Sequence, residues 1–327
     1  MADISLTDAE HVLQDIVSTA DEISAAIETV IEGKPEVVRL ILTVLLAEGH
    51  VLIEDVPGVG KTMLAKALAR SIDCSVSRIQ FTPDLLPSDI TGISAFVRQT
   101  REFEFKPGPV FANIVLGDEI NRAPSKTQAA LLESMEERQV TVDGTTYALE
   151  PPFMVIATQN PLEMDGTYSL PEAQRDRFMA RLAIGYPAVS AQLRMLDRHS
   201  RSSPLDELVP VADAADVRGL ARAVRGVHVS ESVRRYAIDL ATATRTHPGL
   251  RLGASSRATL QLVRACRAYA ALDGRDYVIP DDVQALAVPV LAHRLLPAFE
   301  AEQTVADLVE RLPLPEEKAY GGVAASY

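Results

Sequence analysis

The run from His50 to Met63, HVLIEDVPGVGKTM, limits the possible folds of this chain more than any other stretch. It begins as a short apolar strand, Val51–Ile53, and passes through a glycine-rich turn into a helix with an apolar face. Gly58 and Gly60 permit backbone conformations that residues with a Cβ rarely adopt. The first turn of a helix offers free N–H donors and a partial positive charge to phosphate groups. The sequence therefore predicts a nucleotide phosphate site formed by Val56, Pro57, Gly58, Val59, Gly60, Lys61, Thr62 and Met63.

Lys61 and Thr62 supply the side-chain chemistry expected of such a site. A lysine provides a cation for the β- and γ-phosphates, and a threonine hydroxyl is a ligand for Mg²⁺. One residue departs from the G-x-x-x-x-G-K-[ST] pattern, because Asp55 stands where the pattern has its first glycine. The alternative is a glycine-rich loop that binds nothing, and the two strand-end motifs that follow argue against it.

Two further apolar strands are expected to end in polar residues suited to phosphate chemistry. Residues 112–116 lead into Asp118, which can hold Mg²⁺, and Glu119, which can polarise the water that attacks the γ-phosphate. Residues 153–158 lead toward Asn160, whose amide can orient that water. The alternatives are an acidic pair that is merely solvated at a strand end and an Asn-Pro dipeptide that only forms a turn.

Composition narrows the class of protein. A chain of 327 residues with 47% hydrophobic residues can bury a substantial core and is expected to form two domains. Its formal net charge of -13 argues against wide contact with nucleic-acid phosphates. The acidic start of the chain lacks the apolar segment of a signal peptide, and the longest apolar stretch, 37–47, is too short to span a bilayer. Cys74 and Cys266 lie outside any C-x-x-C motif, so we expect two reduced thiols in a cytoplasmic protein.

The order of expected elements indicates an α/β core followed by a helical region. Helical periodicity over 9–31 and 36–47 precedes five short apolar strands, typical of a parallel sheet covered on both faces, at 51–53, 78–81, 112–116, 153–158 and 182–184. Beyond Pro187 the strand pattern stops, and 200–210 reads as a connector. Four helices are then expected at 214–224, 231–244, 257–271 and 281–293.

These helices carry recognisable end signals, and the pattern divides the chain into segments. Gly274 lies just past the end of the third helix, and Asp281 or Asp282 is placed to cap the fourth. We therefore predict a nucleotide-binding core over 1–190, a linker with an extra helix over 191–213, a helical lid over 214–317 and a mobile tail over 318–327.

Two hairpins are expected to interrupt the core. The run FVRQTREFEFK within 93–106 alternates Phe103 and Phe105 with charged residues around a turn near Gln99-Thr100-Arg101. The run QVTVDGTTYAL at 139–149 turns on Asp143-Gly144, the strongest short hairpin signal. Either could be an ordinary edge hairpin, but they flank the strand that ends in the acidic pair, one before it and one after it.

Several segments then occur in a characteristic order: FTPDLLPSDITG (81–92), GDEINRAPSKTQAALLESMEERQVT (117–141), ATQNP (157–161), LPEAQRDRF (170–178) and GASSR (253–257). Over about 31–294 the chain resembles the MoxR family of AAA+ ATPases. The resemblance implies an AAA+ P-loop core with a five-stranded parallel sheet, hairpin insertions and a small all-α lid. It makes Gly58 to Thr62 the Walker A motif, Asp118 and Glu119 the Walker B motif, and Asn160 sensor 1. Members of this family often tolerate a carboxylate at the position of Asp55.

The resemblance also assigns roles to arginines. Arg177 corresponds to an arginine finger that reaches the γ-phosphate of the adjacent subunit, and Arg175 is a nearby competitor. Arg257 corresponds to sensor 2, on the first turn of a lid helix facing the nucleotide. The segment 187–210 resembles the extra helix that repositions the lid in this clade, so the subunit on which Arg257 acts stays open. Arg122 is a further candidate to reach across an interface.

The resulting hypothesis is Mg²⁺-dependent ATP hydrolysis by a ring of identical subunits, expected to be a hexamer. Family resemblance couples this activity to chaperone-like remodelling or maturation of client protein complexes, with a partner that carries a von Willebrand factor A domain. One alternative is a nucleic-acid motor, but the hairpin at 139–149 carries Asp143 and no lysine or arginine beyond the neighbouring Arg138. Another is a nucleotide-gated platform without turnover, which the presence of Glu119, Asn160 and Arg177 argues against.

Overall fold

The core of the molecule is a five-stranded parallel sheet, as predicted. The computed structural model describes residues 6–99, 101–160, 168, 170–199, 204–297 and 300–315. The sheet has the strand order β2-β5-β8-β1-β9 and consists of β1 (Val51–Glu54), β2 (Val76–Gln80), β5 (Ile114–Asp118), β8 (Met154–Gln159) and β9 (Ala180–Leu182). Because all five strands run in one direction, the residues after β1, β5 and β8 meet at one edge.

Alternate residues of the central strands enter two different hydrophobic clusters. In β8, Met154 and Ile156 pack on one face with helices α1 to α3, whereas Val155 and Ala157 pack on the other with α4 and α5. Both faces are therefore covered, which explains the continuous apolar character of the strands. These covering helices are α1 (Leu6–Glu28), α2 (Pro35–Leu46), α3 (Lys61–Ser71), α4 (Pro87–Thr91) and α5 (Ser125–Glu137).

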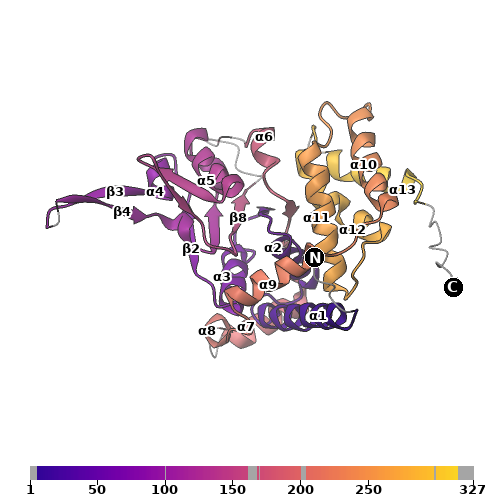
Figure 1. The fold of residues 1–327 in the computed structure, drawn as a ribbon, viewed down its shortest axis with the longest axis horizontal. Coiled ribbons are helices and arrows are strands. Elements are labelled where there is room, and N and C mark those ends of the chain that lie inside the picture. Colours follow the sequence, from indigo (N-terminus) through magenta and orange to yellow (C-terminus); the bar gives the residue numbers. More distant parts are fainter. Residues whose placement is uncertain are drawn as a thin grey trace, which may run out of the picture.

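The chain after β9 is helical, and its last four α-helices form a bundle beside the sheet (Figure 1). This bundle contains α10 (Glu231–Thr246), α11 (Ser256–Leu272), α12 (Pro280–Leu291) and α13 (Ala301–Arg311). Arg39 of α2 joins it to the core, because its guanidinium lies 4.2 Å from the ring centroid of Tyr269 and 2.7 Å from Asp273. The preceding helix, α9 (Ala214–Val224), packs against α2 of the core.

Shorter elements connect these parts. They are α6 (Glu172–Arg175), α7 (Val189–His199) and α8 (Pro204–Glu207), with single 3-10 turns at η1 (Pro109–Phe111), η2 (Ile120–Arg122) and η3 (Ala292–Arg294). Among the helices of the described ranges, none combines the length and apolar character needed to cross a membrane. The predicted tail over 318–327 lies outside the described residues.

Two hairpins project from the core where the sequence predicts them. They are β3 (Gly92–Val97) with β4 (Glu102–Pro107), which extends far from the sheet in Figure 1, and β6 (Gln139–Val142) with β7 (Thr145–Ala148). Phe105 of the first stacks on Tyr147 of the second with ring centroids 4.0 Å apart. Phe103, its neighbour in the alternating pattern, is 74% exposed. The two aromatics share one face of β4, so their different exposure follows from their position along the hairpin: Phe105 is nearer the core and reaches β7, whereas Phe103 is nearer the tip.

Several predicted boundaries were wrong. The last core strand is Ala180–Leu182 rather than 182–184, because it is an edge strand whose central Arg181 pairs with Glu54 and so interrupts the apolar pattern. The connector at 200–210 contains the helical turn α8, which starts at Pro204. The amphipathic helix α13 was not predicted at all.

Of the two residues predicted to cap α12, Asp282 does so from within the first turn. The N-cap position is Ile279, and Asp282 accepts a hydrogen bond from the Ile279 N–H at 2.9 Å from the third helical position. Ser255 caps α11, accepting from the Ala258 N–H at 3.0 Å. Gly274 follows α11 with a positive φ of 71°, as expected for a residue past a helix end.

Candidate nucleotide-binding site

The turn between β1 and α3 forms one wall of a pocket of about 410 Å³. Gly58 and Gly60 have φ angles of 83° and 96°, so both positions need glycine. Among the described residues no side chain caps α3, which leaves the N–H donors of its first turn available to an anion. The pocket is lined by Pro57, Gly58, Gly60, Lys61, Thr62, Met63, Arg78, Asp118, Glu119 and Asn160. The structure thus brings together residues from three predicted motifs.

Asp55, the residue that departs from the P-loop pattern, is 8% exposed and has a structural role. Its carboxylate accepts hydrogen bonds from the N–H of Val56 at 2.8 Å and from the N–H of Gly185 at 2.6 Å. These bonds join the start of the phosphate loop to the segment after β9. Glycine at position 55 could not make this connection, and the positive φ angles of the loop fall at Gly58 and Gly60 instead.

Replacing Asp55 with alanine should therefore destabilise the core. Removal of the carboxylate leaves the partly buried N–H of Gly185 without its acceptor, at a cost of about 1 to 3 kcal/mol in the free energy of unfolding. Urea unfolding followed by circular dichroism measures this difference. Asp239→Ala, at an exposed position of α10, is the matched control and should change the free energy by less than about 0.5 kcal/mol. Equal unfolding curves for the two variants would show that the Asp55 contacts contribute nothing.

Lys61 opens α3 and points across the phosphate loop. Its ammonium donates to the backbone oxygen of Asp55 at 2.6 Å. Partial burial lowers the pKa of Lys61, and the nearby carboxylates of Asp55, Asp118 and Glu119 oppose that shift. The lysine is thus a cation that faces two acidic residues across the space where phosphates would bind.

Asp118, the last residue of β5, is held by two neighbouring strands. One oxygen accepts from the Thr158 hydroxyl of β8 at 2.6 Å, and the other pairs with Arg78 of β2 at 2.6 Å. Thr158 in turn accepts from the Glu119 N–H at 2.9 Å. Neither Thr158 nor Arg78 was singled out from the sequence. The sequence signal that could have identified Thr158 is its position directly after four apolar strand residues.

Glu119 follows in a left-handed backbone conformation, with φ 56° and ψ 50°. A residue with a Cβ is uncommon there, and such backbone strain is concentrated at functional sites. Its carboxylate accepts from Gln80 of β2 at 2.8 Å and lies 3.2 Å from Arg122. Arg122, predicted as a candidate for a subunit interface, therefore pairs within its own chain. Asn160 lies just past β8, is 6% exposed and also lines the pocket.

Arg177 and Arg257 lie elsewhere, and both contact Glu136 near the end of α5. Arg177 is 3.2 Å from one carboxylate oxygen, and Arg257 pairs with the other. Neither arginine is among the described residues that line the pocket of Lys61. The sequence leaves open the subunit on which Arg257 acts, and in this arrangement its guanidinium contacts Glu136 rather than the pocket of its own chain. Glu136 was not predicted from the sequence.

The Arg177 cluster, formed by Arg177, Arg257 and Glu136, lies at the edge of the sheet opposite the phosphate loop. Arg177 shortly precedes β9, and the Met179 N–H donates to His50, the residue before β1. β1 has four residues, so at about 3.3 Å per residue its two ends lie about 13 Å apart. The cluster also joins the lid, because Ser255 donates to Asp176 at 2.9 Å. Arg175 lies in α6, and its Nε is buried without a hydrogen-bond partner in the described structure.

Two family models match the chain. Residues 50–180 match the ATPase family associated with various cellular activities (AAA), and residues 242–312 match the AAA lid domain. The first range runs from His50 to the start of β9 and includes every residue that lines the pocket. The second runs from within α10 to just beyond α13.

Similar proteins cover nearly the whole chain. It is 49% identical over 300 residues to the uncharacterized protein YeaC of Bacillus subtilis, with 90% of this chain and 94% of that protein covered. It is 40% identical over 294 residues to the chaperone MoxR1 of Mycobacterium tuberculosis, with 87% and 78% covered. The crystal structure of a candidate ATPase from Cytophaga hutchinsonii has a TM-score of 0.88 and 37% identity, covering 95% of this chain and 99% of that chain.

Proposed function

This chain belongs to the MoxR family of AAA+ ATPases, and we propose that it hydrolyses ATP in a ring of identical subunits to remodel or mature client protein complexes. One observation carries the proposal. The residues suited to bind and attack a phosphoryl group lie at one edge of the sheet, and the two arginines suited to complete the site lie at the other. Because neither arginine lines the pocket of Lys61 in its own subunit, we propose that two neighbouring subunits complete one site.

The pocket residues divide the work of hydrolysis. Lys61 and the free N–H groups at the start of α3 bind phosphate oxygens. Glu119 accepts a proton from the attacking water, and Asn160 orients that water. Thr62 and Asp118 would hold Mg²⁺, and the carboxylate orientation fixed by Thr158 and Arg78 suits that role. Bound Mg²⁺ neutralises negative charge on the phosphates.

Assembly supplies the missing arginines. We propose that Arg177 stabilises the charge that develops on the γ-phosphate of the adjacent subunit, and that Arg257 acts on the same neighbouring nucleotide. Glu136 keeps both guanidiniums together in the isolated subunit. Arg177 belongs to the core and Arg257 to the lid. Their joint contact with one phosphate group would therefore make the positions of both parts depend on the nucleotide that is bound. We propose that the ring is a hexamer, as the resemblance to the MoxR family implies.

The proposed client is a protein, engaged together with a partner that carries a von Willebrand factor A domain. Addition of the cognate partner should raise the ATPase rate, whereas DNA or RNA should leave it unchanged, because the chain is strongly acidic. A phosphate-release assay at physiological salt compares these additions, and a Glu119→Gln trap used in a pull-down identifies the partner. Salt-sensitive stimulation by nucleic acid would contradict the remodelling proposal and favour a nucleic-acid motor.

A further inference from the structure

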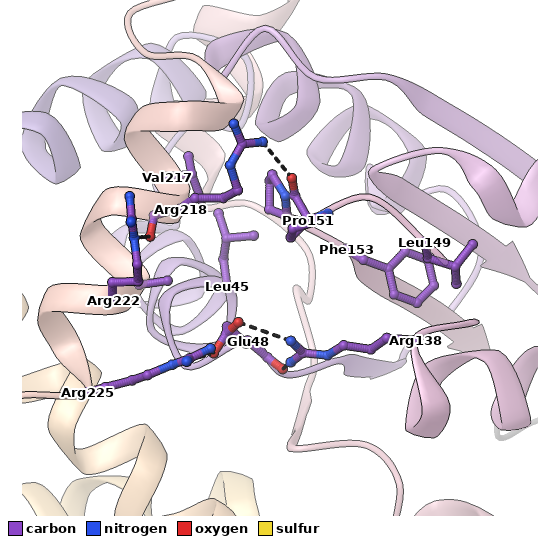
Figure 2. A pocket seen from close by; sticks show the side chains of 12 residues that line it. Leu45, Glu48, Arg138, Leu149, Pro151, Phe153, Val217, Arg218, Arg222 and Arg225 are labelled. Carbon is purple, nitrogen blue, oxygen red and sulfur yellow. Dashed lines mark hydrogen bonds and ion pairs between the residues drawn. The ribbon is translucent and has the colours of Figure 1, made fainter. Parts of the chain in front are cut away.

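A second pocket of about 410 Å³ lies at the edge of the sheet opposite the phosphate loop (Figure 2). Phe153 precedes β8 and lines this pocket, whereas Asn160 follows β8 and lines the nucleotide pocket. β8 has six residues, so the two pockets are separated by about 20 Å. The second pocket therefore has to be explained separately from ATP binding.

Four segments that are distant in the sequence form its walls. They are the end of α2 with the turn after it (Leu45, Glu48), the residue after α5 (Arg138), the link between β7 and β8 (Leu149, Pro151, Pro152, Phe153), and α9 with the residue after it (Val217, Arg218, Ala221, Arg222, Arg225). Its floor is apolar, because the side chains of Leu45, Phe153 and Val217 face it in Figure 2. Burial of an apolar group on this floor would be favourable.

Arginines form the rim of this pocket. Arg138 and Arg225 both bind Glu48, the former at 3.0 Å and the latter through its Nε at 3.0 Å. Arg218 donates to the Pro151 carbonyl at 2.9 Å, and Arg222 donates to the Arg218 carbonyl at 3.3 Å. In the described part of the chain no ion pair engages Arg218 or Arg222. Arg218 does interact with the exposed Asp213 carboxylate at the start of α9, so the rim offers two guanidiniums outside any ion pair of the described residues, one of them near a carboxylate of its own chain.

The spacing of the α9 arginines indicates the shape of the occupant. Arg218, Arg222 and Arg225 follow one another at intervals of four and three residues, so they share one face of the helix. At 1.5 Å per residue they form a row about 10 Å long. One carboxylate or phosphate group cannot span such a row. Acidic residues two positions apart in an extended peptide lie about 6.6 Å apart on one face and match it better.

From this geometry we propose that the second pocket binds a segment of a protein partner that pairs acidic side chains with an apolar one. The acidic groups contact Arg218 and Arg222 on the rim, and the apolar side chain rests on Leu45 and Phe153. Arg225, whose side chain is 63% exposed, leaves the rim open to a larger molecule. The Arg138–Glu48–Arg225 contacts already show that the rim accommodates a carboxylate between two arginines.

Fluorescence anisotropy of labelled hexapeptides tests this proposal on the full-length protein without nucleotide, so its outcome is independent of the ATPase proposal. The probes are Asp-Leu-Asp-Phe-Glu-Leu, the uncharged Asn-Leu-Asn-Phe-Gln-Leu and the polar Asp-Ser-Asp-Ser-Glu-Ser. The first should bind with a Kd of about 10 to 100 μM, and the other two at least about tenfold more weakly. Arg222→Glu should weaken binding of the first peptide by about tenfold or more.

Two further variants make the test specific. Arg235→Glu, at an exposed position of α10 away from the pocket, should keep the affinity within about twofold. Ala221→Met, which fills the pocket without changing its charge, should weaken binding as Arg222→Glu does. Equal binding of the uncharged peptide, no effect of Arg222→Glu, or no acidic–apolar binding below about 1 mM would overturn the proposal. So would full displacement by inorganic phosphate with no dependence on the apolar residues, which would indicate a small-anion site.

Discussion

The Glu119→Gln variant is expected to bind ATP like the wild-type protein and to hydrolyse it about 10² to 10⁴ times more slowly. The amide keeps the size and one acceptor of the carboxylate but cannot take a proton from water. Isothermal titration calorimetry with ATP and a phosphate-release assay separate the two steps. Glu133→Gln, at an exposed position of α5, is the matched control and should hydrolyse ATP normally. Wild-type turnover by Glu119→Gln would show that another group activates the water.

Lys61→Ala should have the complementary defect. Its ammonium contacts phosphate before the reaction, so its loss should weaken ATP binding by about 10- to 100-fold, the equivalent of one hydrogen bond to a charged group. The same calorimetric titration measures this change. Binding at the wild-type level would place the phosphates away from Lys61. Together the two variants distinguish a residue that binds from a residue that reacts.

The nucleotide pocket could be predicted because each of its predicted residues lies within a short motif at a strand end. Parallel strands bring such ends together, so local patterns were sufficient to place Lys61, Asp118 and Asn160 at one edge. The pattern alone could not explain Asp55, because its partner Gly185 is 130 positions away. A contact of this kind depends on strand order, which the sequence pattern does not specify.

The sequence pattern also could not predict that Glu136 pairs with Arg177 and Arg257. Glu136 lies on a helix among other charged residues and resembles a solvated surface position, and Arg257 is 121 positions away from it. The edge strand β9 was misplaced for a related reason, since Arg181 pairs with Glu54 at the side of the sheet. Charged side chains that pair over long sequence distances carry no periodic signal. They nevertheless hold Arg177 and Arg257 on one carboxylate, outside the pocket of Lys61.

Arg177→Ala is therefore expected to lower the turnover of the assembled protein by about 10³ to 10⁵, the effect of an arginine finger supplied by another subunit. ATP binding should be unchanged, because Arg177 lies at the far end of β1 from the phosphate loop. Steady-state phosphate release and ATP titration measure the two quantities. Arg175→Ala provides the comparison, since Arg175 is the competing candidate two residues earlier. A normal rate in Arg177→Ala together with a large loss in Arg175→Ala would move the finger to Arg175.

Mixing defective subunits distinguishes action on the neighbour from action within one chain. Arg177→Ala subunits keep an intact pocket, and Lys61→Ala subunits keep an intact Arg177 at the opposite edge. A mixed ring contains interfaces where an intact pocket meets an intact arginine, so partial turnover should return at ATP concentrations well below the Kd of Lys61→Ala, where each variant alone hydrolyses little ATP. Mass measurement of the mixed assembly confirms that the subunits have combined. If combined rings remain inactive, Arg177 does not complete the neighbour's site, because the restored interfaces would contain every residue assigned to hydrolysis.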